Sequence, residues 1–233
     1  MPGPIIYLIP AVIDEAATFT VLPYIIDAVK DCQAIFAENE RTTRRFLKSI
    51  WKEMVIDEYE WFTIHNAEKE EVISFKKKIS EGKNIAIISE AGCPGIADPG
   101  QILVHVAQEM NLVVRPLVGP SSILLALMGS GLNGQQFQFI GYLPIDIQPR
   151  SARIKELEEE SAKKKCTQIF IETPYRNNQL IETILKTARP STRLCIACDL
   201  TSVREFIKTK TIAEWRKETL NFHKRPAIFL LLA

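Results

Sequence analysis

Glycine and proline gather in one short stretch of the chain, and these residue types indicate a ligand-binding loop. Gly92, Pro94, Gly95, Pro99 and Gly100 follow shortly after an apolar run that is typical of a buried strand. Glycine has no Cβ, so a ligand can approach the backbone closely there. In open α/β sheets, ligands bind beyond the carboxyl ends of strands. This stretch is therefore the first candidate for a binding site, although a tight connection without a ligand would use the same residues.

A second turn, at residues 116–122 with the sequence PLVGPSS, ends another apolar run and precedes a helix-like segment. Ser121 or Ser122 is well placed to cap that helix, and this role needs no ligand. The free backbone N–H groups of a helix N-terminus also bind carboxylates and other anions. Both roles can coexist at this turn.

Glu38 ends a further apolar run, and Arg41 follows three residues later. By the carboxyl-end rule, Glu38 lies on the ligand side of the sheet, where Arg41 could hold a phosphate or pair with Glu38. From these residues alone, an ordinary salt bridge is the favoured interpretation.

Charged residues dominate between positions 148 and 165, where Arg150, Arg153 and the three lysines at 163–165 are mixed with glutamates. The pattern is typical of a solvated helix of mixed charge. A phosphate-contacting edge is the functional alternative.

The composition indicates a globular chain without a membrane segment. Of 233 residues, 46% are hydrophobic and 24% are charged, and the formal net charge is +1. Any contact with RNA must therefore use a local patch. Cys195 and Cys198 lie in a strand-like run, and no second cysteine pair completes a metal site. We expect a cytoplasmic protein with reduced cysteines, no bound metal and no membrane span.

Short apolar runs alternate with segments of helical period along the chain. This alternation predicts an α/β fold with mostly parallel sheets, because parallel neighbours need long crossover connections. The turn at residues 116–122 divides the chain into an N-terminal lobe, residues 1–117, and a C-terminal lobe, residues 118–233. The expected strands are residues 5–9, 34–37, 85–89, 113–117, 138–141, 168–172, 194–197 and 227–232, and the expected helices include residues 20–29, 70–81, 102–110 and 179–187.

Several segments, in order along the chain, match one family signature. Residues 89–100, SEAGCPGIADPG, are similar to S-D-A-G-T-P-x-I-x-D-P-G. Residues 114–122, VRPLVGPSS, are similar to V-x-P-L-P-G-P-S/C-A, and residues 139–144, FIGYLP, to F-x-G-F-L-P. Residues 169–176, IFIETPYR, are similar to a strand followed by E-S-x-x-R. These are motifs of the tetrapyrrole-methylase superfamily, and the chain resembles its branch of small-subunit ribosomal RNA cytidine 2′-O-methyltransferases.

The resemblance implies a tetrapyrrole-methylase-like fold of two α/β lobes, with S-adenosylmethionine bound in a cleft between the lobes. It also implies a homodimer. Carried over position by position, it assigns cofactor binding to Pro10, Ala91, Gly92, Ile96, Ser121 and Ser122, with Glu172 as a weaker candidate.

The same resemblance nominates residues for the reaction. The family's A-E-D-T-R corresponds to AENER at residues 37–41, which keeps Glu38 and Arg41, and its H-N pair is similar to His65 and Asn66. A ribose hydroxyl is a poor nucleophile at neutral pH, and methyl transfer to it benefits from a base or from groups that lower its pKa. Glu38, Arg41 and His65 are therefore the expected catalytic neighbourhood.

Three departures from the family pattern suggest a divergent branch. Residues 11–15, AVIDE, lack the family's glycine after Pro10, Asn39 replaces a central acid, and Cys93 replaces a threonine. The leading hypothesis is methylation of a ribose 2′-hydroxyl of 16S ribosomal RNA, with ribosomal RNA or the small ribosomal subunit as partner. The alternatives are a methyltransferase that acts on a tetrapyrrole or another small molecule, and a degenerate protein that only binds S-adenosylmethionine.

Overall fold

The computed structural model describes residues 3–64 and 69–233, and the chain divides into two compact units. The first comprises Met1–Ser121 and the second Ser122–Ala233. The change from one unit to the next thus falls at the end of the turn at residues 116–122, whereas the sequence placed it at residue 117. In the described part of the chain, no helix has the length and apolar character that a membrane crossing requires.

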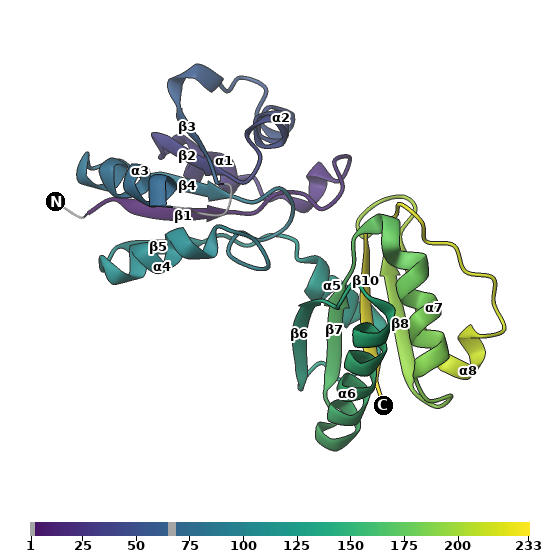
Figure 1. The fold of residues 1–233 in the computed structure, drawn as a ribbon. Helices are drawn as coiled ribbons and strands as arrows, with labels where there is room; N and C mark the ends of the chain where they lie inside the picture. Colours follow the sequence, from purple (N-terminus) through teal and green to yellow (C-terminus); the bar gives the residue numbers. More distant parts are fainter. Residues whose placement is uncertain (1–2, 65–68) are drawn as a thin grey trace. The chain divides into compact units, whose positions relative to one another are not determined.

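A five-stranded sheet forms the centre of the first unit (Figure 1). Its strands follow the order β3-β2-β4-β1-β5, and every neighbouring pair is parallel. The carboxyl ends of all five strands therefore lie at one edge, where the loops that carry the candidate residues begin. The strands are β1 (Ile5–Ile9), β2 (Ala34–Ala37), β3 (Glu60–Thr63), β4 (Ile85–Ile88) and β5 (Val113–Pro116).

Helices cover both faces of this sheet. In β2, Ile35 belongs to the core under α1 and α2, whereas the next residue, Phe36, belongs to the core under α3 and α4. Successive side chains of a strand point to opposite faces, so a strand buried on both faces is apolar at every position. The helices are α1 (Tyr24–Lys30), α2 (Glu40–Ile50), α3 (Lys69–Ser80) and α4 (Gln101–Glu109).

The sheet of the second unit corrects one prediction. Its order is β6-β7-β10-β8-β9, and only β6 and β7 run parallel, whereas the other neighbouring pairs are antiparallel. The expectation of mostly parallel sheets is therefore confirmed for the first unit and wrong for the second. The physical reason is that β8 and β9 form a hairpin and the last strand inserts between β7 and β8. The strands are β6 (Phe137–Tyr142), β7 (Thr167–Ile171), β8 (Arg193–Cys198), β9 (Phe206–Thr211) and β10 (Ala227–Leu232).

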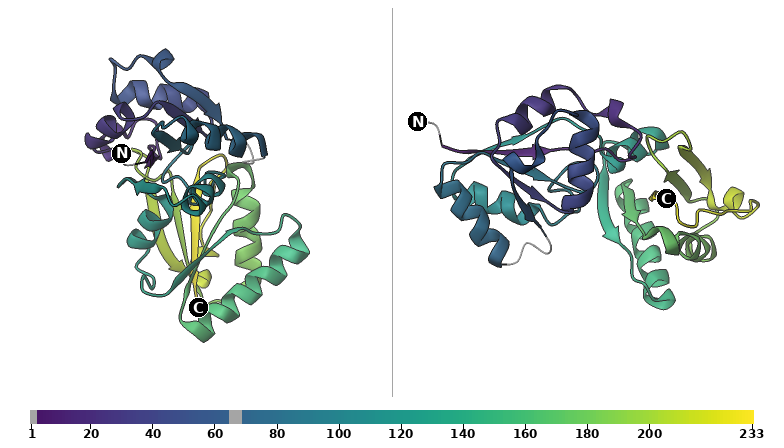
Figure 2. Two further views of the ribbon diagram at one scale, coloured as in Figure 1. Left: turned by 90° about the vertical axis from the view of Figure 1, so that its left-hand side faces the viewer. Right: turned by 90° about the horizontal axis from the view of Figure 1, so that it is seen from above.

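Helices also lie on this second sheet, as the two views of Figure 2 show. One core joins Leu157 of α6 and Ile184 of α7 to Phe229 of β10, and α5 packs against β8, β9 and β10. Gly129 of α5 lies so close to β9 that a Cβ there would meet Ile207 Cδ1 at 2.7 Å. The helices are α5 (Ser122–Ser130), α6 (Ile147–Lys164), α7 (Asn177–Thr187) and α8 (Ile212–Trp215).

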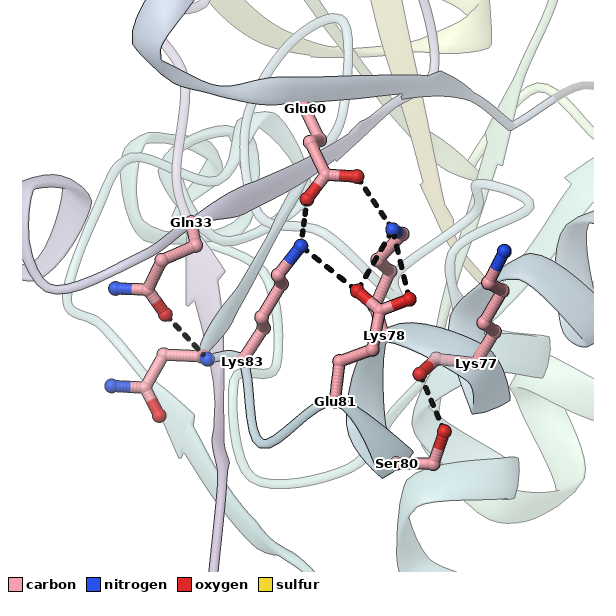
Figure 3. A network of polar contacts seen from close by, with 8 residues as sticks. Gln33, Glu60, Lys77, Lys78, Ser80, Glu81 and Lys83 are labelled. Atoms are coloured by element: carbon pink, nitrogen blue, oxygen red, sulfur yellow. Dashed lines mark hydrogen bonds and ion pairs between the residues drawn. The ribbon is translucent and has the colours of Figure 1, made fainter.

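Four charged side chains form a ring at the opposite edge of the first sheet, where β3 begins (Figure 3). Glu60 of β3 pairs with Lys78 of α3 at 2.5 Å and also with Lys83. Glu81 pairs with Lys78 at 2.9 Å and with Lys83 at 2.8 Å. Each cation therefore contacts both acids, and the ring ties β3 to the end of α3.

Candidate active site

The glycine-rich loop, residues 89–100, follows β4 and is held by its own aspartate. Asp98 accepts hydrogen bonds from Gly95 N at 2.8 Å and from Gly100 N at 2.7 Å. Gly92, Gly95 and Ala97 have φ angles of 74°, 83° and 61°, a left-handed region that glycine enters freely and alanine enters at a cost. The hydrogen bonds of Asp98 therefore define the backbone of the loop, and Gly92 and Gly95 are glycines because their φ angles are positive.

Two hydrogen bonds join this loop to the segment that follows β1. Ala11 N donates to Gly92 O at 2.9 Å, and Gly92 N donates to Ala11 O at 3.1 Å. Both backbone hydrogen-bonding groups of Gly92 are thus engaged within the protein. The contribution of Gly92 is therefore its left-handed φ of 74°, a conformation that residues with a Cβ rarely adopt.

Pro10 is packed directly against the turn after β5. A Cβ added to Gly119 would overlap the ring of Pro10, so only glycine fits at position 119 without a shift. The segment after β1 lacks the glycine that the resemblance leads one to expect. It nevertheless reaches the glycine-rich loop through Ala11 and the β5 turn through Pro10.

Glu38, directly after β2, holds the start of the glycine-rich loop through Glu90. Its Oε2 accepts a hydrogen bond from Glu90 N at 2.8 Å. The next residue, Asn39, caps α2 by accepting from Thr42 N at 3.2 Å, and its Nδ2 donates to Glu90 Oε1 at 3.2 Å. The amide that replaces the family's central acid is therefore both a helix cap and a loop contact.

Burial raises the pKa of the Glu38 carboxyl above its ordinary value. The hydrogen bond from Glu90 N–H lowers this pKa, and the nearby charges of Asp98 and Glu90 raise it again. The salt bridge with Arg41 that the sequence favoured does not form: Arg41 is exposed, and Glu38 uses its charge on a backbone N–H instead. Glu38 is thus a half-buried acid with a raised pKa at the carboxyl end of the sheet.

Other predicted site residues have varied surroundings. His65 lies outside the described residues. Ser122 begins α5, directly after Ser121. Glu172 follows β7, and its Oε1 accepts from Thr173 N at 2.7 Å and from Arg176 Nη2 at 2.7 Å. Its Oε2 is buried without a hydrogen-bond partner among the described residues, so this carboxylate keeps one oxygen for a further donor.

A cavity of about 430 Å³ opens between the segment after β1 and α2, and we call it the β1–α2 cavity. Ala11, Val12, Ile13 and Phe46 form its apolar walls. It extends to the first residues of the glycine-rich loop, so Ala91 is a predicted cofactor residue that borders it. Its polar lining consists of Glu15, Thr42, Arg45, Ser49 and Glu90.

Arg45 was not predicted from sequence, although a signal for it exists. Thr42, Arg45 and Ser49 recur at the spacing of one helix face, and all three line the β1–α2 cavity. Arg45 Nη2 lies 3.4 Å from Glu15 Oε1, with both side chains largely exposed. Such an exposed pair is weak, so the guanidinium can exchange Glu15 for another anion.

A second cavity of about 360 Å³, which we call the loop cavity, lies against residues 93–96 of the glycine-rich loop. Ile96, another predicted cofactor residue, lines it. The remaining lining comes from the ends of β1 and β5 and from the start of α4, and it carries no charged side chain. Besides Ile96, the residues that line the loop cavity are Leu8, Cys93, Pro94, Gly95, Gln101, Val104, Pro116 and Leu117.

Cys93 behaves as a packing residue in this cavity. Its Sγ lies 3.4 Å from Pro120 O, and burial, with a smaller effect of Asp98, raises the pKa of the thiol. A raised pKa keeps the sulfur protonated at neutral pH, which disfavours a nucleophilic role.

Comparison with known proteins agrees with this architecture. Residues 24–215 match the model of the family described as Tetrapyrrole (Corrin/Porphyrin) Methylases. Ribosomal RNA small subunit methyltransferase I of Buchnera aphidicola subsp. Schizaphis graminum (strain Sg) is 29% identical over 231 residues, which cover 98% of this chain and 78% of that protein.

Two solved structures share the fold. The methyltransferase CobJ is 16% identical with a TM-score of 0.65, over 99% of this chain and 94% of that chain. A uroporphyrin-III C-methyl transferase from Thermus thermophilus, complexed with S-adenyl homocysteine, is 14% identical with a TM-score of 0.54, over 99% and 97%. The expected tetrapyrrole-methylase-like α/β fold is confirmed. Because the family match spans most of the residues, the chain belongs to the tetrapyrrole methylases, a family of S-adenosylmethionine-dependent methyltransferases.

Proposed function

We propose that the chain transfers a methyl group from S-adenosylmethionine to a ribose 2′-hydroxyl of 16S ribosomal RNA. An RNA acceptor is supported by the relative named for small-subunit ribosomal RNA, which matches nearly the whole chain. The structural observation that carries the proposal is the β1–α2 cavity, where a weakly paired arginine and two hydroxyl side chains border the glycine-rich loop. We also infer a homodimer, from the family resemblance, and a cytoplasmic location.

The loop cavity fits the cofactor. Its volume lies within the ~300–1,000 Å³ of small-molecule sites, and its uncharged walls suit an adenosine group. Bound there, S-adenosylmethionine supplies a methyl group on a positively charged sulfur. Ile96 and the backbone at Gly95 would contact it, and the buried residues Pro10 and Gly92 would hold the loop in place. A cofactor contact of Ala91, which is exposed, remains a prediction. Ser121, Ser122 and Glu172 remain predictions for the rest of the cofactor.

The β1–α2 cavity fits a nucleotide of the acceptor. Arg45 would contact a phosphate oxygen in place of Glu15, because arginine binds phosphate through charge-assisted hydrogen bonds. Thr42 and Ser49 donate their hydroxyl protons to the backbone oxygens of Asn39 and Phe46, so they would accept hydrogen bonds from ribose or base. Phe46 offers an apolar surface. Alignment of donor and acceptor contributes much of the rate of such a displacement.

Glu38 would act on this cavity through the loop. It holds Glu90 N–H at 2.8 Å, and Glu90 lines the cavity, so Glu38 is a positioning residue in this proposal. A direct role as base for Glu38, and roles for Arg41 and His65, remain predictions.

Arg45→Ala tests the acceptor site. With isolated small ribosomal subunits and labelled S-adenosylmethionine, we expect the KM for the subunit to rise roughly tenfold, the value of one charge-assisted contact. The affinity for S-adenosylmethionine, measured by calorimetry, should stay unchanged. Lys77→Ala removes another exposed cation, on α3, and should leave both values as they are. An unaltered KM in Arg45→Ala would remove Arg45 from the acceptor site.

The choice of acceptor is tested in the same assay with total RNA and a porphyrinogen run in parallel. Label in the small-subunit RNA supports the proposal. Label in the porphyrinogen alone would establish a small-molecule methyltransferase, and cofactor binding without label in any acceptor would indicate a protein that only binds S-adenosylmethionine.

A further inference from the structure

A buried arginine near the start of α6 lacks the partners that such a group requires. Arg150 is 2% exposed, although its surroundings in the sequence are typical of a solvated helix. Its Nε and Nη1 atoms are buried and hydrogen-bond to no group in the described part of the chain. A buried guanidinium without an acceptor is costly, so buried arginines normally have one.

Arg150 lines a cavity of about 330 Å³ between α6 and α7, which we call the α6–α7 pocket. The two helices pack against each other in the second unit (Figure 1). From α6 the pocket also receives Ser151, and from α7 it receives Gln179, Thr183 and Lys186. Hydroxyl, amide and ammonium side chains therefore line the same pocket as the unpartnered guanidinium.

The electrostatic setting favours an anion. Ile147, the first residue of α6, lines the pocket, so the pocket lies beside the first turn of an 18-residue helix, where the helix dipole is positive. The first turn of α6 contains no acid, and the exposed Asp146 at the N-cap makes no capping hydrogen bond. Glu182 is the acid that lines the pocket, and it pairs with Lys186 at 2.5 Å.

We propose that the α6–α7 pocket binds a phosphate group, with Arg150 Nε and Nη1 as donors. Phosphate offers oxygens that accept charge-assisted hydrogen bonds, and both arginine and helix N-termini favour it. The group comes either from free phosphate or from a phosphodiester of RNA. Only the second source rests on the proposed function, and the two sources are separated by the experiment.

The first arm measures melting temperature during a titration with inorganic phosphate, with chloride replacing it at constant ionic strength. The unmodified chain should melt higher as phosphate increases, because a ligand that binds the folded state stabilises it. Arg150→Met should lose this rise or show an apparent affinity at least about tenfold lower, the value of one charge-assisted hydrogen bond. Arg150→Lys, which keeps the charge, should retain part of the rise.

Arg153→Met is the matched control, because Arg153 lies on the same helix and pairs with Glu156 at 3.0 Å outside the pocket. It should keep the full phosphate response. In chloride alone, Arg150→Met should melt no lower than the unmodified chain, since methionine fills the space and removes a buried charge. Equal phosphate responses in all chains, or a large loss of stability of Arg150→Met in chloride, would overturn the proposal.

The second arm measures binding of a short single-stranded RNA by fluorescence anisotropy at several salt concentrations. If the phosphate belongs to RNA, Arg150→Met reduces the salt slope by about one ion, and free phosphate competes with RNA in the unmodified chain. If only free phosphate binds, the salt slope is the same in both chains while the melting response still separates them.

Discussion

Among single residues, Glu38 has the clearest link between geometry and titration. Its raised pKa arises mainly from burial, so the folded state favours the protonated form. A carboxyl whose folded-state pKa is raised stabilises the fold fully below its ordinary pKa of 4.5, and this contribution is lost as the pH rises through the folded pKa.

Glu38→Gln should remove this dependence on pH. The amide oxygen can still accept the hydrogen bond from Glu90 N–H, and it carries no charge to bury. We therefore compare the melting temperature of the variant minus that of the unmodified chain. This difference should be larger at pH 7 than at pH 4. Glu53→Gln, at an exposed position, should show no such trend. The same difference at both pH values would contradict the burial of an ionised Glu38.

Sequence reasoning located Glu38 at the loop edge but misjudged the surroundings of Arg150. Glu38 ends an apolar strand, and the carboxyl-end rule then places it at the loop edge. Arg41 was chosen by its motif and is exposed, so its catalytic role stays a prediction, whereas Arg45, one turn later, lines the β1–α2 cavity. Arg150 was grouped with surface charges, but it shares the spacing of the buried residues Ile154 and Leu157, so the helical period would have identified it.

Among the elements, the turn after β5 has the tightest fit. A Cβ at Gly119 would overlap the ring of Pro10, and Pro10 precedes Ala11, which is bonded to the glycine-rich loop. Gly119→Ala should therefore destabilise the first unit by about 1–3 kcal/mol, the usual cost of overpacking. It should also weaken S-adenosylmethionine binding, because the displaced proline shifts the loop.

The matched control is Gly134→Ala, since a Cβ at Gly134 meets nothing within 4 Å. Thermal melting and calorimetry on both variants separate a local steric effect from a general effect of alanine. A Gly119→Ala chain with unchanged cofactor affinity would show that the position of Pro10 does not matter for the site.

The strands that the sequence predicted are mainly those with a continuous apolar run. Two strands were missed, β3 and β9, and each is the edge strand of its sheet. An edge strand is only partly covered, so Glu60 in β3 and Lys208 in β9 interrupt the apolar pattern. Strand direction in the second sheet was also not predictable, because composition does not reveal that β10 inserts between β7 and β8.

For the whole molecule, positive and negative charges nearly balance, so any electrostatic binding depends on local groups. The formal net charge is +1, too small to attract RNA without local clusters. Arg45 in the first unit and Arg150 in the second are the arginines that line the cavities described above. The α/β class followed from the alternation of strands and helices, and the two lobes from the turn at residues 116–122 and the family resemblance. The cavities depended instead on which helix face each residue occupies.

The ring of Glu60, Lys78, Glu81 and Lys83 should make the first unit sensitive to acid. Hydrogen bonds from Lys78 and Lys83 lower the pKa of Glu60, and hydrogen bonds from Lys83 and Lys78 lower that of Glu81 to about 2. Acids with a lowered folded-state pKa stabilise the fold above their ordinary pKa, and this stability is lost as the pH falls from about 5 towards about 2. Lys83→Met should lower the urea midpoint at pH 7 and flatten its decline towards pH 3, because both acids lose one cation. Lys77→Met changes a neighbouring exposed lysine and should have the urea midpoint of the unmodified chain at every pH. If Lys83→Met also had that midpoint at every pH, the ring would contribute no stability.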